Sequence, residues 1–337
     1  MEDILNAIVL LSNFVVIPAL AYGSQLALGA LGVTLIYGIL RFSNFAHGEI
    51  MSFGTMIALL FMWWFQSMGV SIDPLPTVLL ALPFAIVVTI AMVLVADRSI
   101  FAYYRRKKSA PVILLIASTG LMFVLNGVIR FIIGPDDQRV VDGARFVIKV
   151  RDFRDATGLS EGLALKSSQL ISVTTALVCM GALFWFLNKT RSGKSMRAYS
   201  DNEDLALLSG VNPDRVVTIA WIIAGALAAI AGTLYGLDKS YKPFTYLQLL
   251  LPIFASAIVG GIGNPVGAIV GGFLIAISEV TVTYAYKKFL TYLVPVDWAP
   301  DGLAQLLATD YKFAVSFMIL VVVLIVKPTG IFSGKSL

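Results

Sequence analysis

The chain alternates between long apolar runs and short polar segments rich in glycine, proline or charge. A helix that crosses a membrane needs about 20 predominantly apolar residues, and a set of runs approaches that length. Two of them could be halves of re-entrant segments, so the pattern predicts about 8–10 spans. We therefore expect an all-α, polytopic transmembrane helix bundle that forms a single permease-like domain over residues 1–337. The runs cover residues 4–22, 24–40, 50–66, 75–96, 112–133, 170–187, 216–237, 249–262, 266–286 and 313–326.

Composition supports a membrane protein. Of 337 residues, 58% are hydrophobic and 13% charged, with a mean hydropathy of +0.87. Soluble domains carry about 25% charged residues. The net charge of +5 comes from basic residues between the apolar runs, which suits anionic lipid rather than nucleic acid. One histidine and one cysteine, Cys179, argue against a metal site, a disulfide or a membrane-embedded enzyme.

The distribution of Lys and Arg predicts the orientation, because basic loops stay on the cytoplasmic side. Residues 98–108 and 189–197 are strongly basic, and Lys327 and Lys335 follow the last run, so we expect the C-terminus in the cytoplasm. This leaves residues 134–168 outside as a small external loop domain, with a hairpin near residues 146–151. Asp97 and Arg130 stand at helix ends, from which their side chains can reach water.

A polar stretch at residues 41–49 interrupts the apolar pattern and contains the only histidine. It is either a solvated loop that leaves His47 and Glu49 in water, or a broken helix beside a translocation path. In the second case the free backbone groups and a new helix N-terminus face a water-filled cavity. Candidate path residues here are Asn44, Phe45, His47 and Glu49.

A second interruption combines glycines, an asparagine and a proline at residues 259–267. Proline cannot continue the helical hydrogen bonding and glycine tolerates positive φ, so a tight turn between two helices follows. The turn is either a plain hairpin or part of the path, where it would contribute Gly260, Gly261, Gly263 and Asn264. On the outgoing helix, Glu279 is either a transport residue or a structural hydrogen-bonding partner.

Residues 188–215 form a predicted cytoplasmic coupling region. Ser200 and Glu203 suggest a capping box, and Gly210 a C-terminal cap, so a short helix is expected between two membrane spans. Its apolar edge, Leu205 with Leu208, either meets a partner outside the bilayer or lies on lipid headgroups.

Four segments together resemble the permease subunits of the ATP-binding cassette importers for branched-chain amino acids. They are residues 41–49 with their Asn-Phe-Ala-His-Gly-Glu core, residues 204–210, the glycine-rich residues 257–268, and the ending Lys-Pro-Thr-Gly-Ile-Phe at 327–332. Related permeases for urea or short amides share the pattern. The coupling segment departs from the wider importer class, because it reads Asp-Leu-Ala rather than an acidic residue followed by two alanines.

The resemblance implies a permease in the bacterial inner membrane that translocates branched-chain amino acids. Its implied partners are a second homologous permease, two cytoplasmic ATP-binding subunits that use ATP–Mg²⁺, and an external solute-binding protein. No cofactor is expected in this chain. The residues that would couple it to the ATPase are Arg197, Glu203, Asp204, Leu205, Ala206, Leu208 and Gly210.

The sequence also predicts that ATP hydrolysis happens elsewhere. Gly-Lys-Ser occurs at residues 193–195 and 334–336, but Asn188 and Thr329 stand where a phosphate-binding loop needs its first glycine. The rival function is an ion-coupled secondary transporter, which needs carboxylates deep in the bundle. Only Glu279 and Glu49 qualify for that role.

Overall fold

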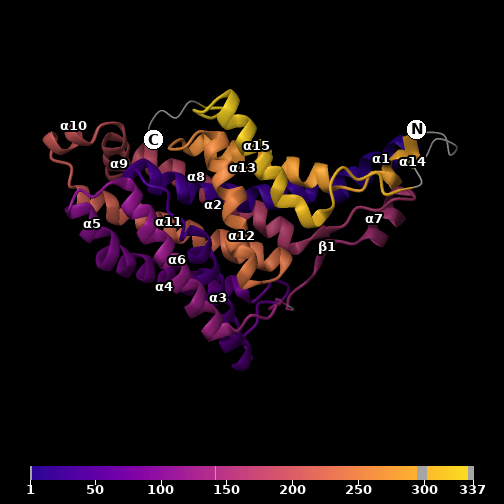
Figure 1. The fold of residues 1–337 in the computed structure, drawn as a ribbon. Coiled ribbons are helices and arrows are strands. Elements are labelled where there is room, and N and C mark those ends of the chain that lie inside the picture. Colours follow the sequence, from indigo (N-terminus) through magenta and orange to yellow (C-terminus); the bar gives the residue numbers. More distant parts are fainter. Residues whose placement is uncertain (1, 141, 294–301, 333–337) are drawn as a thin grey trace.

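Long apolar helices make up most of the structure (Figure 1). It is a computed structural model that describes residues 2–140, 142–293 and 302–332. Nine helical segments of these residues are long and apolar enough to cross a membrane, which confirms the predicted class. The long helices are α2 (Ile17–Leu40), α3 (His47–Ser67), α4 (Val78–Ala96), α6 (Pro111–Ile133), α8 (Ser167–Lys189), α11 (Pro213–Lys239), α12 (Pro243–Gly260), α13 (Pro265–Thr283) and α15 (Lys312–Val326).

Shorter elements extend or connect these helices. The structure pairs its two short strands as an antiparallel ladder. These elements are α1 (Glu2–Leu11), η1 (Ser12–Val16), η2 (Asp97–Phe101), α5 (Ala102–Arg106), β1 (Phe146–Ile148), α7 (Val150–Thr157), β2 (Leu165–Lys166), α9 (Arg191–Asp201), α10 (Glu203–Leu208), α14 (Lys287–Leu293) and η4 (Thr309–Tyr311).

The first two predicted spans are one continuous helix of 39 residues, Glu2–Leu40, so their separation was wrong. Gly23 stands between the two predicted runs, but it is helical. A Cβ at Gly23 would lie 2.6 Å from Cδ1 of Phe273, so glycine is there to admit α13. Within the helix, the Ser24 hydroxyl donates to the Leu20 carbonyl over 2.8 Å, so this buried polar group has a partner.

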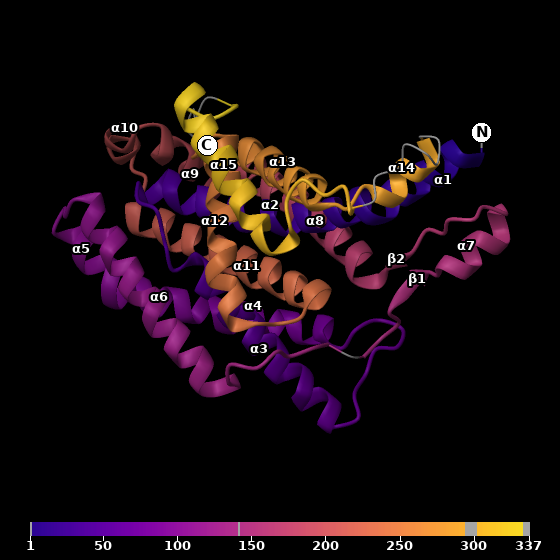
Figure 2. The same cartoon turned by 45° about the vertical axis from the view of Figure 1, so that its right-hand side comes forward.

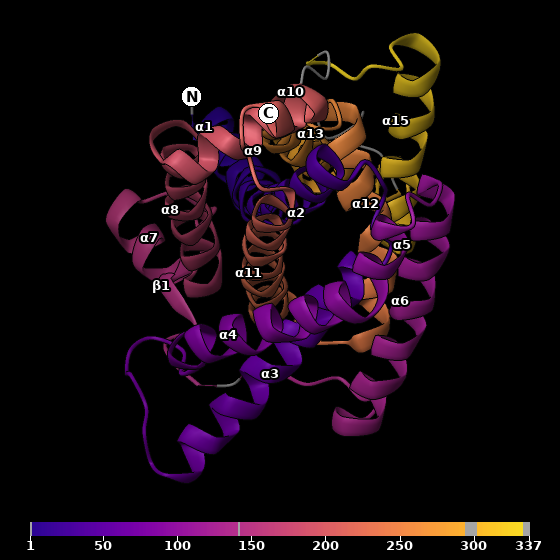
Figure 3. The same cartoon turned by 90° about the vertical axis from the view of Figure 1, so that its left-hand side faces the viewer.

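The core lies where α2, α3, α11, α12 and α13 meet. Figure 3 shows α11 between α2 and the pair α3 and α4, and the packing contacts agree. Close approach depends on small residues, as expected inside a membrane. Gly232 of α11 packs on the Met51 backbone of α3, and Gly271 of α13 packs on the Ser256 carbonyl of α12. Gly232 and Gly271 therefore serve helix packing within the chain.

The two ends of the bundle differ (Figures 1 and 2). One end carries α5, α9 and α10, and the opposite end carries the N-terminus, α7, α14 and the strands. The predicted strand at 146–148 is present, but its partner β2 lies beyond α7, so the hairpin is interrupted by a helix. Of the two Gly-Lys-Ser sequences, residues 193–195 lie inside α9. Residues 334–336, with Lys335, lie outside the described residues.

Candidate translocation site

The break between α2 and α3 is buried. Asn44 and His47 are each 1% exposed and Glu49 is 0% exposed, so the solvated-loop interpretation is wrong. The chain leaves α2 at Arg41, in the left-handed region with φ of 56°, and Arg41 donates to the Ser200 carbonyl. Asn44 then stabilises the turn into α3 by accepting from the Ala46 amide over 3.1 Å. The second alternative, a broken helix inside the bundle, describes the observed backbone.

Two glycines make room for this break. A Cβ at Gly32 of α2 would lie 2.6 Å from Cε1 of His47, so the imidazole occupies the space of a missing side chain. A Cβ at Gly48 would lie 2.6 Å from the Tyr246 carbonyl oxygen of α12. Within the described residues, Nε2 of His47 has no hydrogen-bond partner. The start of α3 is therefore wedged between α2 and α12.

Glu49 places a carboxylate in the first turn of the same helix. Its Oε1 accepts from the Asn126 amide of α6 over 2.9 Å, while its Oε2 has no partner in the described part of the chain. Phe45, whose amide donates to Ser118 over 3.1 Å, packs edge-on against Phe254 of α12 with ring centres 5.5 Å apart.

Polar groups continue from Glu49 along α3. Ser52 lies within 3.0 Å of the Tyr241 hydroxyl, and the Tyr246 hydroxyl donates to the Gly232 carbonyl over 2.8 Å. Glu49, Ser52 and Thr55 recur at intervals of three residues, which puts them on one helical face. Sequence reasoning missed this face and Asn126, although the three-residue spacing was a usable signal.

The glycine-rich turn lies elsewhere and has a visible packing role. Gly261 and Gly263 have φ of 110° and 88°, as a tight turn requires, and the Asn264 side chain caps α13 by accepting from the Val266 amide over 3.0 Å. The carbonyl of Gly260 accepts from the Phe332 amide over 3.1 Å. The predicted hairpin is confirmed, and its contacts are with the chain's own C-terminal segment.

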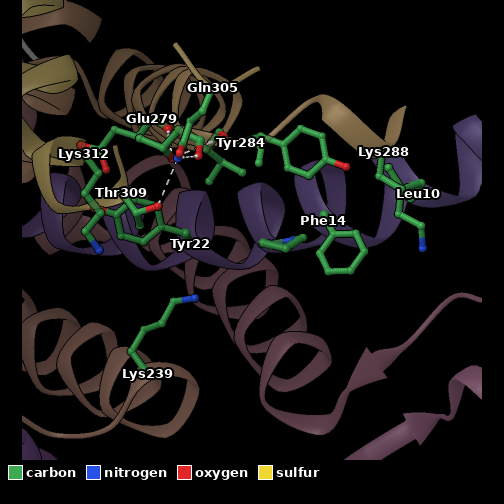
Figure 4. A pocket seen from close by; sticks show the side chains of 14 residues that line it. Leu10, Phe14, Tyr22, Lys239, Glu279, Tyr284, Lys288, Gln305, Thr309 and Lys312 are labelled. Carbon is green, nitrogen blue, oxygen red and sulfur yellow. Dashed lines mark hydrogen bonds between the residues drawn. The ribbon is translucent and has the colours of Figure 1, made fainter. Parts of the chain in front are cut away.

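Glu279 lies apart from both, in the last turns of α13. It is 1% exposed and accepts a hydrogen bond from Ser316 of α15, which is the structural interaction that the sequence allowed. It also lines a cavity of about 630 Å³ between the N-terminal helix, α13 and the start of α15 (Figure 4). The candidate path residues therefore occupy three places: the break, the turn and this cavity.

The coupling region contains two helices, α9 and α10, instead of one. The capping box at Ser200 and Glu203 was wrong, because Ser200 belongs to α9 and donates to the Gly38 carbonyl of α2 over 2.9 Å. Asn202 caps α10 by accepting from the Leu205 amide over 3.0 Å. At the other end Gly210 has φ of 80°, as predicted for a C-terminal cap.

The candidate coupling residues divide into exposed and buried groups. Leu205 and Leu208 are 61% and 85% exposed, Asp204 is exposed, and Ala206 is buried. Glu203 accepts from the Tyr199 hydroxyl over 2.6 Å. Burial and then the Glu203 carboxylate raise the pKa of Tyr199, so the phenol stays protonated and acts as the donor. Arg197 donates to Asn188 over 3.1 Å.

Comparison with known proteins identifies the family. A family model described as the permease component of branched-chain amino acid transport systems matches residues 15–324. The chain belongs to this family. This permease is 30% identical over 314 residues to LivH of Escherichia coli K12, a high-affinity branched-chain amino acid transport system permease protein, covering 92% of this chain and 91% of LivH. It is 28% identical over 316 residues to BraD of Pseudomonas aeruginosa, a permease protein described in the same words, covering 94% of each chain.

The match includes the buried break, the glycine-rich turn, Glu279 and the helices α9 and α10 of this permease. The predicted family and the predicted class of multi-pass transport protein are therefore confirmed. The relatives are transport permeases.

Proposed function

We propose that this permease forms a translocation path for branched-chain amino acids in an ATP-driven importer of the bacterial inner membrane. Family membership and the names of the relatives support the transport system and the substrate class. The observation that carries the site is Oε2 of Glu49, which lies inside an apolar bundle and has no hydrogen-bond partner among the residues that the structure describes. An ionisable residue at membrane depth marks a substrate or ion path by default.

Glu49 binds the ammonium group of the substrate in this proposal. Asn126 fixes one carboxylate oxygen by its 2.9 Å hydrogen bond and leaves the other free to accept from the ammonium. Phe45 and Phe254 provide the apolar contact that a branched side chain needs. In this proposal the partner for the substrate's own carboxylate comes from a second permease on the other side of the path.

The proposed importer also fixes where the other subunits bind. The basic end with α5, α9 and α10 faces the cytoplasm, together with the C-terminus. There Leu205 and Leu208 contact one of two ATP-binding subunits, which bind ATP–Mg²⁺. An external solute-binding protein delivers substrate to the opposite end. ATP-driven closure of the two subunits moves α10 and shifts the bundle between outward-open and inward-open states.

The test is uptake by the complete complex in proteoliposomes. The binding protein and the solute are added outside the vesicles, and ATP is enclosed in the lumen, which the ATP-binding subunits face. Radiolabelled leucine, valine, urea and acetamide are compared, with and without ATP. We expect ATP-dependent uptake of leucine and valine. Uptake of urea or acetamide without uptake of leucine or valine would show that the proposed substrate class is wrong. Uptake that needs no ATP and follows a proton or sodium gradient would show that the protein is not part of an ATP-driven importer.

Variants locate the path. Glu49→Gln keeps the size and the Asn126 contact but removes the charge, so the KM for leucine uptake should rise at least about tenfold, in line with loss of a buried charge contact to the ligand. Glu2→Gln makes the same chemical change at an exposed position and serves as the control. An unchanged KM in Glu49→Gln would exclude Glu49 from the path.

A further inference from the structure

The cavity beside Glu279 has two chemically different ends. Figure 4 shows Glu279, Tyr22, Thr309 and Lys312 together at one end, and Phe14 and Leu10 toward the other, where Lys288 also lies. The volume of about 630 Å³ lies in the range of small-molecule sites, which is about 300–1,000 Å³. The cavity is thus large enough for an elongated ligand with a polar head and an apolar tail.

Polar atoms at the inner end have unused hydrogen-bonding capacity. Glu279 and Tyr22 are only 1% and 5% exposed and their side chains face each other. Oε2 of Glu279 and the Tyr22 hydroxyl nevertheless form no hydrogen bond of normal geometry with each other or with any other described residue. A buried polar group without a partner is costly. Both residues line the cavity, so a ligand in the cavity can supply the missing partners.

Lys312 adds an opposite charge at the same end. The other two lysines of the lining are already paired, Lys239 with Asp238 at 3.3 Å and Lys288 with Glu161 at 2.7 Å. Lys312 makes no ion pair with any described residue and rests over the rings of Tyr22 and Phe313 at 5.7 and 4.6 Å. It interacts electrostatically with Glu279, but the two charged groups do not come within ion-pair distance of each other.

We propose that this cavity binds a ligand that carries an ammonium and an anionic group next to each other on an apolar body. The ammonium donates to Oε2 of Glu279 and the Tyr22 hydroxyl, and the anionic group pairs with Lys312. The apolar part lies along Phe14 and Leu10. Two sources share this chemistry: a free zwitterionic amino acid such as leucine, and the headgroup of phosphatidylethanolamine with its acyl chains.

This site is separate from the path assigned to Glu49, and its test needs neither ATP nor the other subunits. The full-length permease is purified in detergent and in nanodiscs. Radiolabelled leucine binding is measured in detergent, with N-acetyl-leucine and leucinamide as competitors that each lack one charge. Lipid retention is measured by native mass spectrometry after exchange into nanodiscs of phosphatidylethanolamine or of phosphatidylglycerol, which lacks the ammonium.

The test variants are Glu279→Gln, which keeps an acceptor for Ser316, and Lys312→Gln. Lys242→Gln is the control, because Lys242 pairs with Asp137 at 2.5 Å and does not line the cavity. Glu49→Gln is included so that binding in the proposed path is recognised. We expect either leucine affinity or phosphatidylethanolamine retention to fall at least about tenfold in both test variants and to stay unchanged in the control.

Each outcome decides the proposal. A leucine signal that needs both charges and responds to Glu279 and Lys312 assigns a free amino acid, and selective retention of phosphatidylethanolamine with the same response assigns a lipid. If neither ligand binds, or if binding responds only to Glu49→Gln, the proposal is overturned. The proposed transport function is unaffected in that case, because it is measured by ATP-dependent uptake.

Discussion

The indole Nε1 of Trp221 donates a hydrogen bond of 2.8 Å to Oδ1 of Asp97. The same carboxylate pairs with the guanidinium of Arg105 at 2.9 Å, and Asp97 is only 5% exposed. The sequence had placed Asp97 at a helix end in reach of water, and this was wrong. Asp97 instead ties the end of α4 to α11 beside the stacked rings of Phe101 and Trp221, whose centres are 5.2 Å apart.

Removal of this carboxylate should destabilise the bundle. Asp97→Ala leaves the Arg105 charge and the Trp221 indole without their partner, and breaking a buried pair on one side costs about 3–5 kcal/mol. The free energy of unfolding in detergent, followed by denaturant titration, measures the loss. Arg98→Ala, at an exposed neighbouring position, is the control and should unfold like the wild type. Equal stability of Asp97→Ala and the control would show that the pair contributes nothing.

The space at Gly32 should be coupled energetically to His47. Gly32→Ala places a Cβ 2.6 Å from Cε1 of His47, so the ring must move, and overpacking of this kind costs about 1–3 kcal/mol. His47→Ala should remove most of that penalty. A double-mutant cycle on the unfolding free energy tests this, and additive single effects would contradict the contact. Gly120→Ala, which meets no atom within 4 Å, is the control for an added methyl group.

The exposed edge of α10 should matter for coupling and not for folding. Leu208 is 85% exposed, so its replacement should change the surface of α10 and little else. Glu203 is a poorer choice, because it accepts a hydrogen bond from Tyr199 and replacing it would also disturb the junction with α9. We expect Leu208→Asp to leave ATP hydrolysis by the complex but to lower leucine uptake at least about tenfold, the effect of losing an interface hot spot.

Leu306→Asp introduces the same change at another residue that is 76% exposed, and should transport normally. Reversing Glu203 and Asp204 together should also uncouple transport, but with some loss of α9–α10 order. Normal uptake in Leu208→Asp would exclude the apolar edge of α10 as the contact with the ATPase.

The attachment of α14 should depend on acid pH. Burial raises the pKa of Glu161, but the hydrogen bonds from Lys288 and Tyr292 and the Lys288 charge outweigh it, so the pKa lies below its ordinary value of 4.5. A carboxyl group with a lowered folded-state pKa stabilises above the unfolded value and loses that contribution as pH falls through the folded value. The protection of the α14 amides against hydrogen exchange, measured relative to the intrinsic exchange rate at each pH, should therefore fall below about pH 4.5.

Glu161→Gln supplies the comparison for that measurement. It removes the charge at every pH, so α14 should already exchange faster at neutral pH. Any further loss of protection in this variant at acid pH should come from other titrating groups of the chain. Glu2→Gln, near the N-terminus and exposed, should behave like the wild type. Identical exchange profiles for Glu161→Gln and the wild type would show that the Lys288 pair does not hold α14.

The sequence predicted what depends on local patterns. Apolar runs gave the fold class and the helix count to within one, and Gly210 and the 259–267 turn were found because a cap or a tight turn needs particular backbone angles. It failed where distant contacts decide. Ser200 is inside a helix because the Gly38 carbonyl binds its hydroxyl, and Gly23 is helical because Phe273 needs its space.

The candidate site shows the same division. Polarity in an apolar context identified Glu49 and Glu279 as unusual, but their partners Asn126 and Ser316 lie 77 and 37 residues away in sequence. Burial of the break at His47 depends on Gly32 of another helix and on the backbone of α12. Contacts between residues so far apart in sequence leave no pattern in a short stretch of the chain. The sequence could therefore identify the candidate residues, but it could not predict which of them lie together.

The continuous helix Glu2–Leu40 is about 58 Å long at 1.5 Å per residue, roughly twice the hydrocarbon thickness of a bilayer. Both of its ends are bonded to other elements. Gly38 accepts from Ser200 of α9, and the Asn6 side chain accepts from the Glu161 amide over 3.0 Å. One rod therefore links the helices beside α10 to the loop that holds α14, so a push on one face of the membrane has a stiff mechanical route to the other.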